Sequence, residues 1–141
     1  MVKLDVKFRT GIVLFTLGFL SSLLSQLLCY VSLFEWLTLI ISISYLLIGW
    51  YIFQGYYPKG NLFILIIMGY IYASVFISFA MLGFNLPLAK TIMLSSVFWI
   101  FIQILIIFLI RKKLPRRSTI QLLIEVVCLL LLVVYTVLKN N

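Results

Sequence analysis

The segment that decides the fold occupies residues 111–119 and reads RKKLPRRST. It carries five of the chain's eleven basic residues and separates two long apolar runs. It also contains Pro115, and proline tends to mark helix ends because it lacks a backbone N–H and clashes with the preceding turn. The segment therefore predicts a charged turn between two apolar helices, and we call it the basic hinge. Its cations are Arg111, Lys112, Lys113, Arg116 and Arg117.

Two further prolines, Pro58 and Pro87, precede Pro115 at intervals of 29 and 28 residues, each within a short polar stretch. A helix that crosses the hydrocarbon core takes roughly 20 residues, so each interval fits one membrane span and a short connection. A break without proline is expected near Glu35. Residues 10–53 as a single helix would be about 66 Å long, which is about twice the thickness of that core.

Composition places this chain in lipid rather than in water. Of its 141 residues, 65% are hydrophobic and 10% are charged, and the mean hydropathy is +1.28. A soluble domain is usually about 45–50% apolar and about 25% charged. Lipid offers no partner to backbone polar groups, so the spans must be helices. We predict an all-α integral membrane protein: a five-transmembrane-helix bundle with short loops, forming a single transmembrane domain over residues 1–141.

The positions of the apolar runs give the expected bounds of the spans. The expected spans are Thr10–Tyr30, Leu33–Phe53, Leu62–Gly83, Leu88–Ile110 and Ile120–Leu138. Residues 2–9 alternate between polar and apolar side chains, and they are expected to form a short interfacial lead-in with snorkelling cations. A β-strand is the alternative for these eight residues.

The distribution of cations predicts the orientation, because basic residues near span ends mark the cytoplasmic side. With the N-terminus in the cytoplasm, nine of the eleven cations lie on that side, and only Lys90 and Lys139 lie outside. Four expected spans separate the basic N-terminal segment from the basic hinge, and an even number is needed for the two to share a side. We expect a multi-pass protein of the cell membrane (inner or plasma membrane), with a cytoplasmic N-terminus and the C-terminus outside.

Few residues could carry out catalysis. The chain has no histidine, which is the commonest metal ligand and general base. Its three acids are Asp5, Glu35 and Glu125, and no two of them can share a site by local spacing. A nucleic-acid module requires a basic patch on a folded polar face. In this chain, the cations lie instead at the ends of apolar runs. We therefore expect no enzyme, no metal site, no cofactor and no nucleic-acid partner; the lipid bilayer is the expected partner.

Four polar residues inside the expected spans are the candidate functional residues: Glu125, Gln121, Gln26 and Gln103. A charged group at mid-span costs roughly 2.5–3.5 kcal/mol on insertion scales, so such residues point to a functional site. Glu125 is interpreted as a proton or cation relay, as a contact with a partner subunit, or as a protonated or paired structural residue. Gln121 lies one turn earlier on the same helix face. Buried amides such as Gln26 and Gln103 are expected to hydrogen-bond across helices.

The functional interpretation follows from what the chain lacks and from its packing residues. Small residues recur at four-residue spacing, as at Gly69 and Ala73, which favours a compact bundle or a partner interface. The first hypothesis is a non-enzymatic structural or accessory subunit of a membrane assembly, bound to other membrane protein subunits or to itself. The alternatives are a small oligomeric transporter or channel using Glu125, and a membrane immunity protein that protects against a membrane-active toxin.

Overall fold

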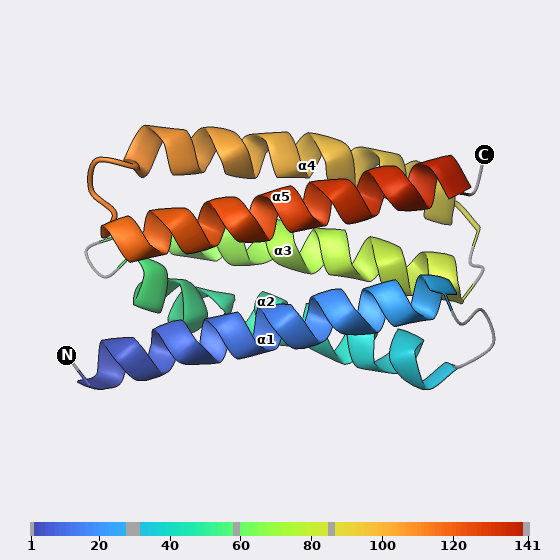
Figure 1. The fold of residues 1–141 in the computed structure, drawn as a ribbon, viewed down its shortest axis with the longest axis horizontal. Coiled ribbons are helices and arrows are strands. Elements are labelled where there is room, and N and C mark those ends of the chain that lie inside the picture. Colours follow the sequence, from blue (N-terminus) through green and yellow to red (C-terminus); the bar gives the residue numbers. More distant parts are fainter. Residues whose placement is uncertain (1, 28–31, 58–59, 85–86, 140–141) are drawn as a thin grey trace.

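The computed structural model of the chain describes residues 2–27, 32–57, 60–84 and 87–139. Each of its helices contains a segment long and apolar enough to cross a membrane, which confirms the prediction of an all-helical chain with five such helices. The helices lie side by side, and the start of the first and the end of the fifth lie at opposite ends of the bundle (Figure 1). They are α1 (Val2–Leu27), α2 (Ser32–Tyr56), α3 (Leu62–Gly83), α4 (Ala89–Ile110) and α5 (Arg116–Lys139).

The boundaries of three helices lie within a few residues of the predicted spans, and two helices begin earlier than predicted. Helix α1 begins at Val2 rather than Thr10, and α5 begins at Arg116 rather than Ile120. The predicted end of the first span at Tyr30 lies outside the described residues. Hydropathy therefore located the helices correctly but underestimated how far two of them extend beyond their apolar runs.

Residues 2–9 are helical, so the prediction of a separate interfacial lead-in is wrong. Contacts with α2 hold this part of the helix. The side chain of Lys7 donates a hydrogen bond to Oε1 of Gln54, and its ammonium group lies 4.5 Å from the centroid of the Tyr51 ring. Gly55 lets the two main chains approach closely, because a Cβ there would lie 2.7 Å from the carbonyl carbon of Lys7. The first turns of α1 are thus part of the bundle.

The basic hinge is only partly a turn. Residues 111–113 form the turn, whereas Arg116 and Arg117 begin α5. Pro115 stands directly before the helix, where its missing N–H does no harm because the first N–H groups of a helix have no partner within it. Its carbonyl oxygen accepts a hydrogen bond from the N–H of Thr119 at 3.1 Å. Proline therefore sets the start of α5 a full turn before the apolar run begins.

Helices α2 and α3 form the most extensive pair in the bundle. They cross at two glycines: a Cβ at Gly49 would lie 2.8 Å from Cα of Gly69, and one at Gly69 would lie 3.1 Å from the carbonyl oxygen of Tyr45. Ser42 of α2 also donates a hydrogen bond to the carbonyl oxygen of Ala73 in α3 at 2.7 Å. Small residues thus allow close backbone approach within the bundle. Helix α1 packs against α2, α4 against α3, and α5 against α4.

Buried aromatic rings fill the centre of the bundle. The ring of Tyr72 in α3 lies 5.0 Å from Phe53, 5.3 Å from Tyr45 and 5.8 Å from Phe15, measured between centroids. Tyr45 also stacks on Phe76 at 5.6 Å. Each such pair stabilises the fold by about 0.5–1.5 kcal/mol in addition to the contribution of its buried apolar area. The rings come from α1, α2 and α3, and α5 makes few close main-chain contacts with α3. Polar contacts from α5 to this layer therefore depend on long side chains.

Candidate functional site

Glu125 lies at the centre of a hydrogen-bonded cluster that joins three helices. Its side chain is 0% exposed. The hydroxyl of Tyr56, at the end of α2, donates a hydrogen bond to Oε1 at 2.8 Å. The hydroxyl of Tyr72, in α3, donates one to Oε2 at 3.1 Å. Each carboxyl oxygen of the α5 residue therefore has a phenolic partner on a different helix.

Gln121 completes the cluster from α5 itself. Its side-chain amide lies against the carboxyl group of Glu125, one helical turn away. This contact agrees with the expectation that the two residues share a helix face. The groups that contact the carboxyl group in this way are two phenols and one amide, all of which are neutral.

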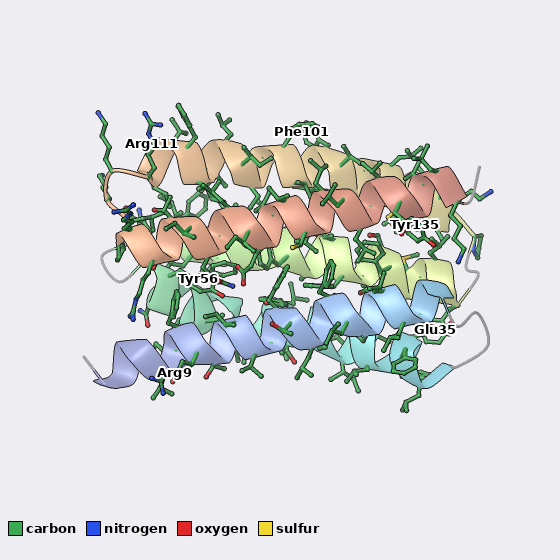
Figure 2. The ribbon with its side chains drawn as sticks, viewed as in Figure 1. Arg9, Glu35, Tyr56, Phe101, Arg111 and Tyr135 are labelled. Atoms are coloured by element: carbon green, nitrogen blue, oxygen red, sulfur yellow. The ribbon has the colours of Figure 1, made fainter. Side chains whose placement is uncertain are left out.

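Gly11 of α1 makes room for the Tyr56 side chain. A Cβ at this position would lie 2.8 Å from the Tyr56 hydroxyl oxygen and 2.8 Å from Cγ2 of Ile52. The neighbouring Phe8 ring packs against the Tyr56 ring in an edge-to-face arrangement, with 5.2 Å between ring centroids. Figure 2 places Tyr56 nearer the end of the bundle that holds Arg111 than the opposite end. Helix α1 thus packs closely around the Tyr56 phenol, which donates its hydrogen bond to Glu125 of α5.

Of the other acids of the chain, Glu35 does not join this cluster. Glu35 lies in the first turn of α2 and is buried, and Figure 2 shows it at the opposite end of the bundle from Arg9 and Arg111. The side chain of Asp5 lies outside the described residues. Within the described part of the chain, no group of three or more His, Cys, Asp or Glu residues could hold a metal ion. Among the residues that the structure describes, Glu125 is thus a single acid whose hydrogen-bond partners are neutral.

Comparisons with known proteins add nothing to this geometry. No protein-family model, curated protein or solved structure matches the chain. Functional conclusions therefore depend on the contacts of the residues themselves.

Gln103, one of the two amides expected to bridge helices, behaves differently from the acid. Gln103 of α4 is 1% exposed, and neither its Oε1 nor its Nε2 has a hydrogen-bond partner in the part of the chain that the structure describes. The prediction of a cross-helix hydrogen bond from Gln103 is therefore wrong. Its neighbours on the buried face of α4 are Ile100 and Ile107, which have no polar side-chain group to offer. The side chain of Gln26 lies outside the described residues, so its expected bond stays a prediction.

The phenolic partners of Glu125 are the functional residues that the sequence did not reveal. By position, Tyr56 fits the aromatic residues that mark a membrane boundary, whereas it is buried and points inward. Tyr72 lies in the middle of α3, and a buried tyrosine hydroxyl usually has a hydrogen-bond partner. A tyrosine at mid-span is therefore the signal that could have suggested a partner for a mid-span acid.

The basic hinge lies at one end of the bundle, with the start of α1. Figure 2 shows Arg9 and Arg111 at this end. The guanidinium group of Arg111 lies 4.2 Å from the centroid of the Phe108 ring, and that of Arg117 lies 4.6 Å from the centroid of the Phe8 ring. Such cation–π contacts are worth about 0.5–1 kcal/mol at exposed sites. The Arg117 contact joins the first turn of α5 to α1. The remaining hinge cations, Lys112, Lys113 and Arg116, are exposed.

A groove of about 370 Å³ lies between α1 and α5. The side chains that line it are apolar or aromatic, and Glu125 is not among them. It therefore gives no aqueous route to the buried acid. Its lining residues are Phe19, Leu23, Leu131, Leu132 and Tyr135.

Proposed function

We propose that the chain is a non-enzymatic accessory subunit of a membrane assembly. The observation that supports this most directly is the hydrogen bonding of Glu125. Both of its oxygens are occupied by tyrosines of the same chain, and the side chain is fully buried. A residue that transferred protons or ions would need contact with water or with a substrate. An acid held in this way acts as a tie between helices, which is a structural role.

This proposal takes precedence over an oligomeric transporter or channel using Glu125. Polar residues along a transport path usually face a water-filled cavity or pair along that path. The groove between α1 and α5 is lined by other residues. The small-residue faces that could have lined a subunit interface, such as those at Gly49 and Gly69, are used for packing inside this bundle. Much of the surface available to a partner therefore consists of large side chains.

Helix α4 offers the most accessible surface of this kind, because it is the least enclosed of the five helices. Its outward face carries exposed aromatic residues, and Phe101 is 58% exposed. Figure 2 shows Phe101 pointing away from the bundle. Aromatic residues are enriched at protein interfaces. We therefore place the partner, whether another subunit or a second copy of the chain, against α4. The exposed phenylalanines of this face are Phe98, Phe101 and Phe108.

Site-specific photo-crosslinking in native membranes tests this assignment. A photoreactive residue at Phe101 is expected to give one covalent adduct of defined mass in high yield. The same residue at Leu47 of α2, which is 66% exposed, is the matched control and is expected to give none. An adduct with twice the mass of the chain would identify the partner as a second copy. The proposal fails if neither position gives an adduct and the chain purifies in mild detergent as a folded monomer without a partner.

We further propose that the end of the bundle with the basic hinge faces the cytoplasm of the cell membrane. Basic residues near span ends are retained on that side. A reporter that is active only in the cytoplasm is expected to be active when fused at the N-terminus and inactive when fused after Asn141. The same reporter inserted after Leu114, within the basic hinge, serves as the control and is expected to match the N-terminal fusion. Activity at both termini would contradict five crossings.

A further inference from the structure

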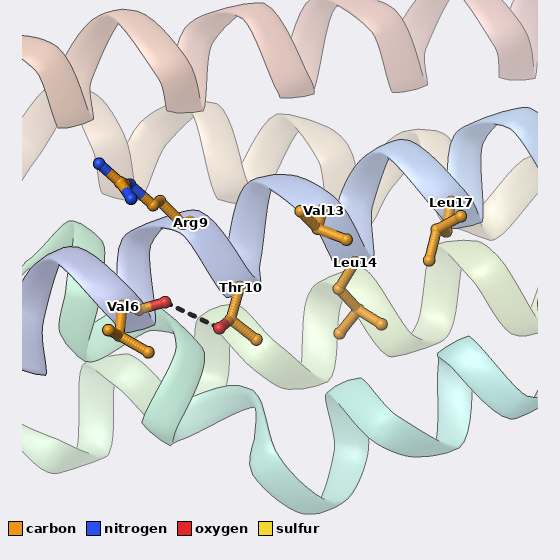
Figure 3. A pocket seen from close by; sticks show the side chains of 6 residues that line it. All are labelled: Val6, Arg9, Thr10, Val13, Leu14 and Leu17. Carbon is orange, nitrogen blue, oxygen red and sulfur yellow. Dashed lines mark hydrogen bonds between the residues drawn. The ribbon is translucent and has the colours of Figure 1, made fainter.

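A second groove, of about 350 Å³, follows the outward face of α1. Figure 3 shows Arg9 and Val6 near one end of it and Leu17 at the other. The Arg9 end is the end of the bundle at which Arg111 and the basic hinge lie (Figure 2). The lining residues are Val6, Arg9, Thr10, Val13, Leu14 and Leu17.

The groove is apolar except at the end that carries Arg9. The hydroxyl of Thr10 donates a hydrogen bond to the carbonyl oxygen of Val6 at 2.7 Å, so it is occupied within its own helix. Arg9 is exposed, and no hydrogen bond, ion pair or ring contact is found for it among the described residues. The nearby cations differ, because Lys7 is bound to Gln54 and Arg117 lies over a phenylalanine ring. Arg9 thus places an exposed guanidinium group at one end of an apolar groove.

The length of the groove matches one leaflet of a bilayer. Along a helix, Arg9 and Leu17 are about 12 Å apart at the usual rise per residue. Half of the hydrocarbon core of a bilayer is about 15 Å thick. If Arg9 lies at the level of the lipid headgroups, the apolar part of the groove reaches almost to the middle of the membrane. An acyl chain of a phospholipid would then have apolar contacts along most of its length.

We propose that this groove binds one anionic phospholipid, with its phosphate on Arg9 and an acyl chain against Val13, Leu14 and Leu17. A guanidinium group matches phosphate in shape and charge and can form two parallel hydrogen bonds to it. The cations of the basic hinge lie at the same end of the bundle, and clustered cations beside a membrane attract anionic lipids. The complementarity is therefore twofold: charge selects the headgroup at Arg9, and the apolar lining selects a ligand with an acyl chain.

Native mass spectrometry of the full chain, released from bilayer nanodiscs of mixed phosphatidylglycerol and phosphatidylcholine, tests this proposal. The wild-type chain is expected to retain one phosphatidylglycerol molecule in preference to phosphatidylcholine. Arg9→Gln is expected to reduce that retention about tenfold, the effect of losing one charge-assisted contact. Lys112→Gln removes one exposed charge from the basic hinge and is the matched control, with retention expected to change less than twofold.

Filling the groove tests the acyl-chain contact separately. Leu17 and Leu20 are both in α1 and both 47% exposed, but only Leu17 lines the groove. Leu17→Trp is expected to lower retention as Arg9→Gln does, whereas Leu20→Trp is expected to leave it unchanged. Equal losses in Arg9→Gln and Lys112→Gln would show a diffuse charge effect and overturn the proposal. It would also fail if inorganic phosphate displaced the lipid at low concentration, because the site would then bind a free anion, or if phosphatidylcholine were retained equally well.

Discussion

Replacing Glu125 with alanine is expected to destabilise the folded bundle by about 2–4 kcal/mol. The substitution leaves the hydroxyls of Tyr56 and Tyr72 buried without their acceptor. An unsatisfied buried donor costs about 1–3 kcal/mol. A hydrogen bond between membrane helices stabilises the packed state by less, about 0.6–1.7 kcal/mol. The free energy of unfolding compares the packed bundle with separated helices that are still in the membrane. The cost of inserting the acid into lipid is therefore not subtracted from this loss.

The comparison that isolates the hydrogen bonds uses Glu125→Gln. Glutamine has nearly the same shape and keeps an acceptor oxygen, so its loss of stability is expected to be less than half that of alanine. Reversible unfolding by a denaturing detergent in mixed micelles, followed by circular dichroism, gives both values. Equal stability of the alanine variant and the wild-type chain would show that the cluster does not hold the helices together.

Removing the donors together with the acceptor provides a further check on the same cluster. The triple variant Glu125→Ala, Tyr56→Phe and Tyr72→Phe removes both hydroxyls with the acceptor, so no buried donor is left without a partner. Residues that share one hydrogen-bond network usually show non-additive effects. The triple variant is therefore expected to lose less stability than the sum of its three single substitutions. Strict additivity would indicate that the three side chains act independently.

The second large effect is expected at the crossing of α2 and α3. Gly49→Val would place a side chain where Cβ alone lies 2.8 Å from Cα of Gly69. Main-chain atoms cannot move aside as a side chain can, so the two helices must separate over their whole contact. Overpacking usually costs about 1–3 kcal/mol, and a β-branched residue against backbone is expected to reach or exceed the upper value. The same detergent titration measures it.

Gly18→Ala, compared with Gly49→Ala, is the matched control for this prediction. The nearest atoms to an added Cβ at Gly18 belong to the side chains of Phe76, at 2.9 Å, and Ile41, at 3.0 Å. Side chains can shift by small rotations, and alanine also favours a helix over glycine by roughly 1 kcal/mol. The net change at Gly18 is expected to be small. A similar loss of stability at both positions would contradict the view that contact between backbones makes Gly49 special.

The number and type of helices could be predicted because lipid leaves the backbone almost no other choice. The starts of α1 and α5 could not be predicted, since hydropathy reports where lipid begins rather than where a helix begins. Lys7 and Arg116 are polar, yet both lie within helices. Packing against Gly55 holds the first helix together beyond its apolar run, and Pro115 sets the start of the fifth.

The sequence identified only part of the candidate site. Glu125 and Gln121 could be identified because acids and amides are rare inside apolar runs, and their spacing alone places them on one face. Tyr56 and Tyr72 could not be assigned to them, because they lie 69 and 53 residues away from Glu125 in the sequence. Which helix faces meet is decided by side-chain packing, as at the two glycines, and hydropathy contains no such information. For Gln103 the sequence predicted a hydrogen-bond partner that the structure does not show among the described residues. Its neighbours on the buried face of α4 are apolar.

The order of synthesis gives the tie at Glu125 a further meaning. The two tyrosines belong to helices that the ribosome completes well before α5. Until α5 is made, Tyr56 and Tyr72 lack the acceptor that Glu125 supplies, and an acid on a newly made α5 is costly in lipid alone. We therefore expect α5 to dock late in folding and to be held in place by these two hydrogen bonds.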